Sequence, residues 1–131
     1  MRDLLATNKN EIVIQDNLSN TRIIFYYKTI KTADRLSYNS EMLKSLTEGG
    51  DIKVTQEKQL NFVLDYITGF EEGSFSYDGA VISCDENSKN YKADWKVFLK
   101  ENASDLLFTV SGVLFGQPNY HLKKNFHSLV N

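Results

Sequence analysis

Cysteine, proline and tryptophan each occur once in the 131 residues. A single cysteine excludes an intrachain disulfide, so the core has to form from apolar packing, for which a chain of this length suffices. An excess of one charge is lacking too, because 15 Lys and Arg oppose 17 Asp and Glu for a formal net charge of -2. That balance disfavours a general binder of polyanions. The composition, 41% hydrophobic and 24% charged, predicts one globular domain over residues 1–131.

Long hydrophobic runs are also missing. The first ten residues hold a short apolar stretch, well below the roughly 7 to 15 apolar residues of a signal peptide. The most apolar segment, Leu106–Gly116, reaches about half of the roughly 20 residues that cross a bilayer. We therefore expect a cytoplasmic protein that has no contact with membranes.

Two segments near the N-terminus are rich in β-branched and aromatic residues. They are Glu11–Gln15 and Thr21–Lys28, and the polar stretch Asp16–Asn20 lies between them. This pattern predicts a β-hairpin. Because two strands alone are marginally stable in water, helices from later in the chain have to cover one face. The expected fold class is therefore α+β, mainly α-helical.

Two helices are predicted next. Residues 33–46, with Thr32 as N-cap, place Leu36, Leu43 and Leu46 near one helix face, and Gly49 and Gly50 end this helix. The second helix has the clearest periodicity in the chain, at i, i+3, i+4 and i+7. It runs between a Thr55 cap and Gly69, and its periodic residues are Leu60, Val63, Leu64 and Ile67.

A small second hairpin and two terminal helices complete the prediction. The hairpin lies within Phe70–Cys84, where Asp78-Gly79 is a turn signal. The first terminal helix has Tyr91, Trp95, Phe98 and Leu99 on one face. A second follows Asn102 and carries Leu106, Leu107, Val110, Val113 and Leu114 until Gly116 and Pro118 end it; a short amphipathic tail has Leu122, Phe126, Leu129 and Val130.

Recognisable catalytic and ligand-binding patterns are lacking. The non-carboxylate metal ligands are limited to His121, His127 and Cys84, and the two histidines are spaced for roughly opposite sides of a helix. Acidic neighbours of Cys84 disfavour a reactive thiolate. Neither a P-loop nor a dinucleotide fingerprint is present. The sequence therefore predicts no catalytic, cofactor-binding or metal residues, although an enzyme that uses carboxylates without a cofactor stays an open alternative.

One segment has the composition of a nucleic-acid platform. Phe25, Tyr26 and Tyr27 are interleaved with the basic residues Arg22, Lys28 and Lys31, and Arg35 extends the basic patch. Such interleaving suits single-stranded nucleic acid, but strand alternation sends at least one of the three rings into the core. A small nucleic-acid-binding or regulatory protein is therefore the alternative function.

The order of the elements carries a resemblance. An early hairpin precedes a threonine-led helix start with an Arg-x-x-Tyr step at Arg35 and Tyr38. An amphipathic helix ending in Gly and an aromatic follows over 62–70, then a turn over 77–82, terminal helices over 95–110 and a Lys-Asn ending over 122–126. This order resembles the bacteriophage tail assembly chaperones, over most of the chain. The resemblance implies a phage origin, which the alternative, a nucleic-acid-binding or regulatory protein, would share.

The resemblance implies a non-enzymatic protein without cofactors that transiently binds the tape measure protein while tail tube protein subunits assemble. It also implies self-association, since a small chaperone gains avidity on a long client by multivalency. Aromatic side chains that the core does not need would be the anchors. The candidates, each of which is also a candidate for the core, are Phe98, Phe108, Phe115, Tyr120 and Phe126.

Overall fold

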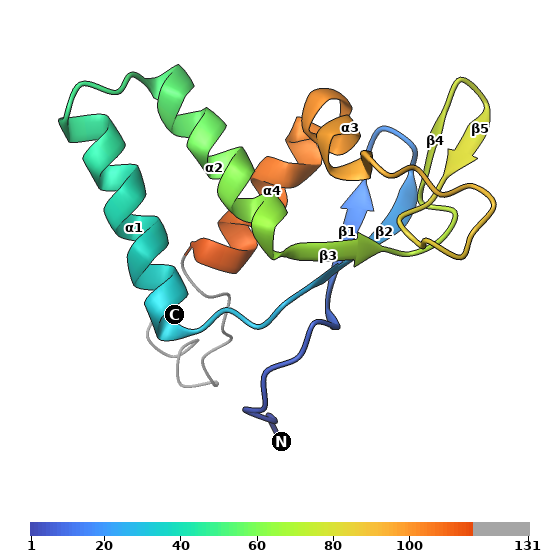
Figure 1. The fold of residues 1–131 in the computed structure, drawn as a ribbon, viewed down its shortest axis with the longest axis horizontal. Coiled ribbons are helices and arrows are strands. Elements are labelled where there is room, and N and C mark those ends of the chain that lie inside the picture. Colours follow the sequence, from blue (N-terminus) through green and yellow to red (C-terminus); the bar gives the residue numbers. More distant parts are fainter. Residues whose placement is uncertain (117–131) are drawn as a thin grey trace, which may run out of the picture.

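The computed structural model describes residues 1–116. Over these residues the chain forms a mixed α+β fold with helices on one side and two small antiparallel sheets on the other (Figure 1). The expected fold class, with an N-terminal hairpin and a second small hairpin, is therefore confirmed. The predicted amphipathic tail and both histidines lie outside the described residues.

The N-terminal hairpin consists of β1 (Asn10–Asp16) and β2 (Thr21–Tyr27), paired in register from Asn10 opposite Tyr27 to Asp16 opposite Thr21. Alternation along β2 sends Ile23 and Phe25 into the core. The strand β3 (Ile67–Phe70) pairs with the other edge of β2, so the sheet order is β1-β2-β3.

The second hairpin also forms as predicted. Strands β4 (Phe75–Tyr77) and β5 (Ala80–Ile82) are joined by Asp78 and Gly79, whose φ angles are 50° and 81°. Two successive positive φ angles define the type I′ turn that the Asp-Gly dipeptide favours.

Four helices occupy the described part of the chain. They are α1 (Thr32–Thr47), α2 (Ile52–Tyr66), α3 (Trp95–Asn102) and α4 (Ser104–Phe115). The central helix is α2, which contacts α1, α3 and α4 (Figure 1). The core lies between these helices and the sheet, and its fully buried residues include Phe25, Val63, Ile67, Leu107 and Val110.

Both predicted caps of the first two helices are wrong. Helix α1 already includes Thr32, and Lys31 is its N-cap residue, whose N–H donates to Asp34 Oδ2 at 2.8 Å. Helix α2 begins before Thr55, because Asp51 Oδ1 accepts the N–H of Val54 at 2.8 Å and caps the helix earlier.

The predicted end of the second helix at Gly69 is also wrong. Helix α2 stops at Tyr66, and the next four residues form β3. Pairing with β2 satisfies the backbone of β3 while Ile67 and Phe70 stay buried. Helix α3 also begins later than predicted. Tyr91, which was expected on its apolar face, precedes the helix and forms an isolated β-bridge with Ser83.

Candidate binding surfaces

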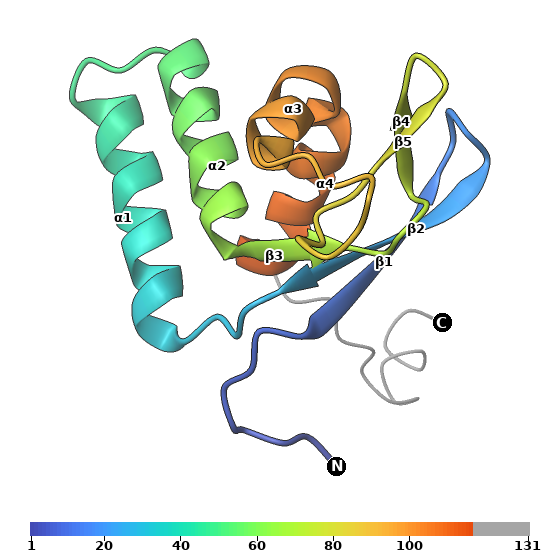
Figure 2. The same ribbon diagram turned by 45° about the vertical axis from the view of Figure 1, so that its right-hand side comes forward.

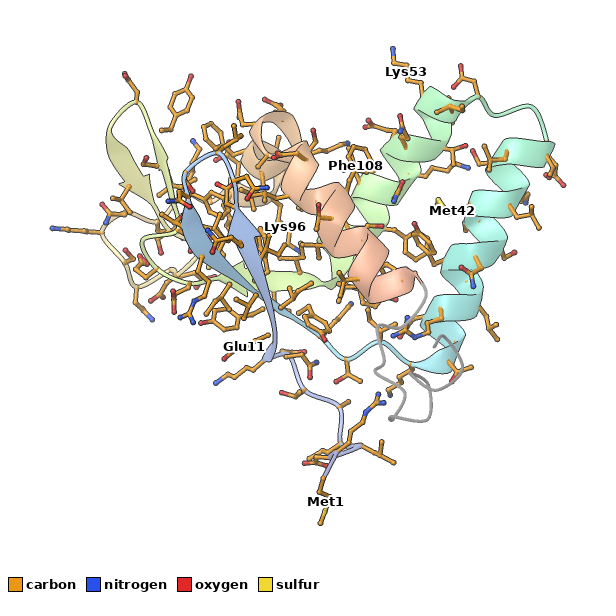
Figure 3. All side chains as sticks on the ribbon, turned by 180° about the vertical axis from the view of Figure 1, so that it is seen from behind. Met1, Glu11, Met42, Lys53, Lys96 and Phe108 are labelled. Atoms are coloured by element: carbon orange, nitrogen blue, oxygen red, sulfur yellow. The ribbon has the colours of Figure 1, made fainter. Side chains whose placement is uncertain are left out.

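The five aromatic residues named as anchors do not form one cluster in the part of the chain that the structure covers. Phe115 is 5% exposed at the end of α4, where its ring stacks on Tyr38. Phe108, on α4 (Figure 3), and Phe98, on α3, are half-buried. Tyr120 and Phe126 lie outside the described residues. Phe115 is thus a core residue, and Phe98 and Phe108 keep part of their surface accessible.

Phe98 belongs to a small aromatic surface at the second hairpin. The rings of Tyr77 and Phe98 meet edge to face with centroids 4.9 Å apart, and Lys92 Nζ lies 4.6 Å from the Phe98 centroid. Tyr77 is 59% exposed. We call Tyr77, Lys92 and Phe98 the Tyr77–Phe98 surface. Sequence reasoning missed Tyr77, although its position directly before the Asp-Gly turn indicates a strand residue at a hairpin tip.

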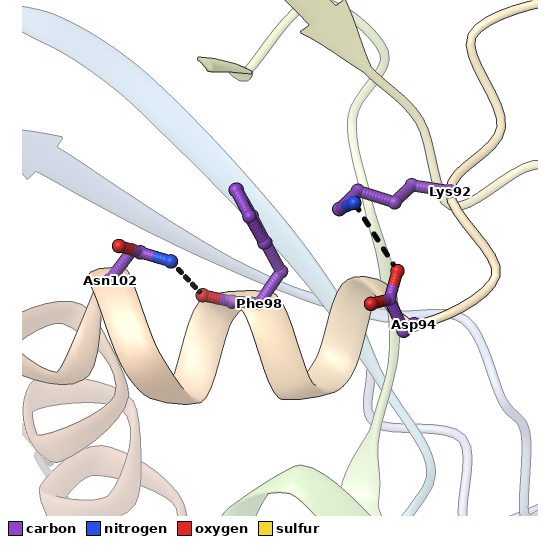
Figure 4. A network of polar contacts seen from close by, with 4 residues as sticks. All are labelled: Lys92, Asp94, Phe98 and Asn102. Atoms are coloured by element: carbon purple, nitrogen blue, oxygen red, sulfur yellow. Dashed lines mark hydrogen bonds and ion pairs between the residues drawn. The ribbon is translucent and has the colours of Figure 1, made fainter. Parts of the chain in front are cut away.

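Polar contacts hold this surface in place (Figure 4). Lys92 Nζ lies 3.4 Å from Asp94 Oδ1, and the Asn102 amide donates to the Phe98 carbonyl at 3.0 Å. Phe98 projects from α3 between these two contacts. An aromatic pair beside a positioned ammonium presents both an apolar contact area and a charge, a combination suited to a protein partner.

The outer face of α1 is a second exposed apolar surface. The sequence pattern places Leu36, Leu43 and Leu46 near one face, and the structure leaves all three more than half exposed. The buried face of α1 is a different one: Ser45 is 4% exposed and shares a 2.8 Å hydrogen bond with Thr55 of α2. Tyr38 packs on Phe62 and Phe115 from the same side.

A heptad seam runs along this outer face. Its residues follow one another at alternating intervals of three and four positions along the helix, and every one of them is exposed. The leucines of the seam are each 63% exposed, and no charged side chain belongs to it. We call this set the α1 seam: Ala33, Leu36, Ser40, Leu43 and Thr47.

A pocket of about 600 Å³ lies against β3 and the loop after β5. Tyr26, Gly69 and Cys84 line it together with several carboxylates. Its polar groups are partly used within the protein, since Glu72 accepts hydrogen bonds from Ser83 and Ser88. None of the described residues that line the pocket is a histidine, and residues 1–116 hold no group of three potential metal ligands.

The proposed nucleic-acid platform is split by the strand. Phe25 is fully buried, as alternation requires, while Tyr26 lines the pocket on the other face of the sheet. Lys28 lies 4.7 Å from the Tyr66 ring centroid, and Arg35 donates to the Leu114 carbonyl. The aromatic and basic groups of this segment therefore do not share one surface.

Comparison with protein-family models, with curated proteins and with solved structures finds no match to this chain. Among the described helices, none combines the length and the apolar character that crossing a bilayer requires.

Proposed function

We propose that this chain is a non-enzymatic tail assembly chaperone of a bacteriophage or prophage that acts in the cytoplasm of the bacterial host. It transiently binds the tape measure protein and the tail tube protein during tail morphogenesis. The order of sequence elements supports the family, and the contact between the exposed Tyr77 ring and the half-buried Phe98 ring is the structural observation that carries a binding role.

The chemistry of the Tyr77–Phe98 surface fits an amphipathic helical client. Aromatic side chains supply large contact areas at low entropic cost and are enriched among residues that dominate binding energy. Phe98 is fixed by α3, whereas Tyr77 stands at the tip of a short hairpin. Lys92 adds a cation that pairs with acidic residues flanking an apolar stripe of the client. So small a surface suits transient binding.

Co-purification tests the proposal. The tagged full-length chain is co-expressed with the neighbouring reading frames of its source genome, and retained proteins are identified by mass spectrometry at moderate salt. We expect recovery of a long helical protein or a tube subunit. Tyr77→Ala should lower recovery about tenfold, a loss of about 1.4 kcal/mol. Leu18→Ala, at another exposed site, serves as the control and should leave recovery unchanged.

The salt dependence of binding distinguishes the alternative function, nucleic-acid binding, from the chaperone function. A nucleic-acid binder would retain DNA or RNA, and its affinity would fall steeply as salt rises. We expect no such binding, and we expect the double charge reversal Arg22→Glu with Lys28→Glu to leave client recovery intact. Recovery of nucleic acid that this double variant abolishes, without any protein client, would refute the chaperone proposal.

A further inference from the structure

We propose that the α1 seam is an interface for a second copy of this chain, in which the two α1 helices pack antiparallel. The inference deepens the self-association that the resemblance implies, and it uses α1 rather than the Tyr77–Phe98 surface, so either proposal can fail without the other. It starts from the observation that the leucines which the sequence pattern groups on one face of α1 are exposed and not buried.

The position of α1 leaves the seam open within the described residues. Figures 1 and 2 both show α1 at one edge of the molecule, with α2 on one side only. Two leucines one heptad apart, Leu36 and Leu43, stay 63% exposed, and the neighbouring Leu46 is 54% exposed. Isolated exposed leucines are common, but a regular heptad seam without charge is typical of helix pairing.

The order of large and small residues on the seam selects the orientation. Small residues alternate with leucines along α1. In a parallel pair each leucine would face its own copy and each small residue another small one, which leaves voids between the layers. In an antiparallel pair Leu36 faces Thr47 of the second copy and Leu43 faces Ser40 of the second copy. Each bulky side chain then meets a small one, so the helices approach closely and fill the space.

The charges around the seam agree with this register. Lys44 directly flanks the seam, and an antiparallel pair in this register brings it nearest to Ser37 of the second copy, so no like charges meet. Antiparallel helices also align their dipoles favourably. The length of α1 limits the area of the interface, because a helix of 16 residues is about 24 Å long.

An interface of this length falls below the standard size, so we expect a dissociation constant of about 10–100 µM. Sedimentation equilibrium of the full-length chain up to about 300 µM should show a monomer–dimer equilibrium. Leu43→Lys should weaken the dimer at least tenfold. Leu18→Lys makes the same change at a leucine that lies off the seam and is 87% exposed, so this control variant should dimerise as the unmodified chain does. Because both positions are exposed, circular dichroism should show that both variants fold.

A charge pair tests orientation and register. Leu36→Glu alone should abolish the dimer, and adding Thr47→Lys should restore it, because each new glutamate then faces a lysine of the second copy. A parallel pair would instead bring the two glutamates together, so Thr47→Lys would not restore the dimer. A chain that is monomeric at every concentration overturns the proposal. So does a monomer in which Leu43→Cys, in a Cys84→Ser background, resists a maleimide, since another part of its own chain would then cover the seam.

Discussion

Tyr38 and Phe115 stack with ring centroids 4.4 Å apart and planes 10° from parallel, which fastens the end of α4 to the middle of α1. The Phe115 ring also meets Phe62 and Tyr66 of α2 edge to face, at 5.9 Å and 5.2 Å. One aromatic side chain thereby joins three helices. Aromatic pairs of this geometry add stabilisation beyond the area that they bury.

Phe115→Ala is therefore expected to destabilise the protein by about 3–5 kcal/mol, because it leaves a cavity between the three helices. Val113→Ala is the matched control on the same helix. Its side chain is 51% exposed, so its cost should stay below about 0.5 kcal/mol. Urea unfolding followed by circular dichroism measures both values. Equal losses for the two variants would contradict the placement of Phe115 in the core.

A second prediction concerns pH. The Tyr66 hydroxyl donates to Asp34 Oδ1 at 2.6 Å, and this bond, with the Lys31 N–H, lowers the pKa of the Asp34 carboxyl. Burial and the same carboxylate raise the pKa of Tyr66 to about 12. A lowered carboxyl pKa stabilises the fold above the unfolded pKa of about 3.9. That stabilisation is lost as pH falls through the lower folded pKa of Asp34.

Tyr66→Phe keeps the ring and removes the hydroxyl, so it should cost less than about 1 kcal/mol at neutral pH, because the pair is partly exposed. It should also make the acid dependence of unfolding free energy below pH of about 4 less steep. Asp34→Asn should have the same effect on the acid limb. Titration of tyrosinate absorbance should show one late group that ionises near pH of about 12, and Tyr66→Phe should remove it. An unchanged titration would exclude this assignment.

The two adjacent glycines between α1 and α2 are expected to differ. Gly49 has φ of +89° with open space around it, so Gly49→Ala should cost about 1 kcal/mol through backbone strain alone. A Cβ at Gly50 would lie 2.2 Å from Ser45 O and 2.6 Å from Ser45 Oγ. Gly50→Ala should therefore cost about 2–4 kcal/mol, since it forces the helices apart and disturbs the Ser45–Thr55 hydrogen bond.

Thermal unfolding of the two variants, with Gly49→Asn as a further control, measures this difference. Asn tolerates positive φ better than Ala, so Gly49→Asn should recover part of the loss. A larger cost at Gly49 than at Gly50 would show that strain, and not the close approach of α1 to this loop, governs the connection.

Local signals in the sequence were enough to predict much of this fold. The β-branched runs predicted the first hairpin, and the Asp78-Gly79 dipeptide predicted a turn that the structure contains. The periodicity of Leu60, Val63 and Leu64 located α2 and its buried face. These features depend on residues close in sequence, whose geometry is set by propensity and periodicity.

The tertiary structure alone decided the rest. Strand β3 is too short to be stable by itself and exists because β2 offers an unpaired edge. Periodicity places Leu36 and Leu43 together, yet only the packing of Tyr38 and Ser45 on α2 turns that face outward. Phe98 and Phe115 look alike in the sequence, and their neighbours from distant segments leave one half-buried beside Tyr77 and place the other in the core. The physical reason is that burial depends on contacts that local sequence does not encode.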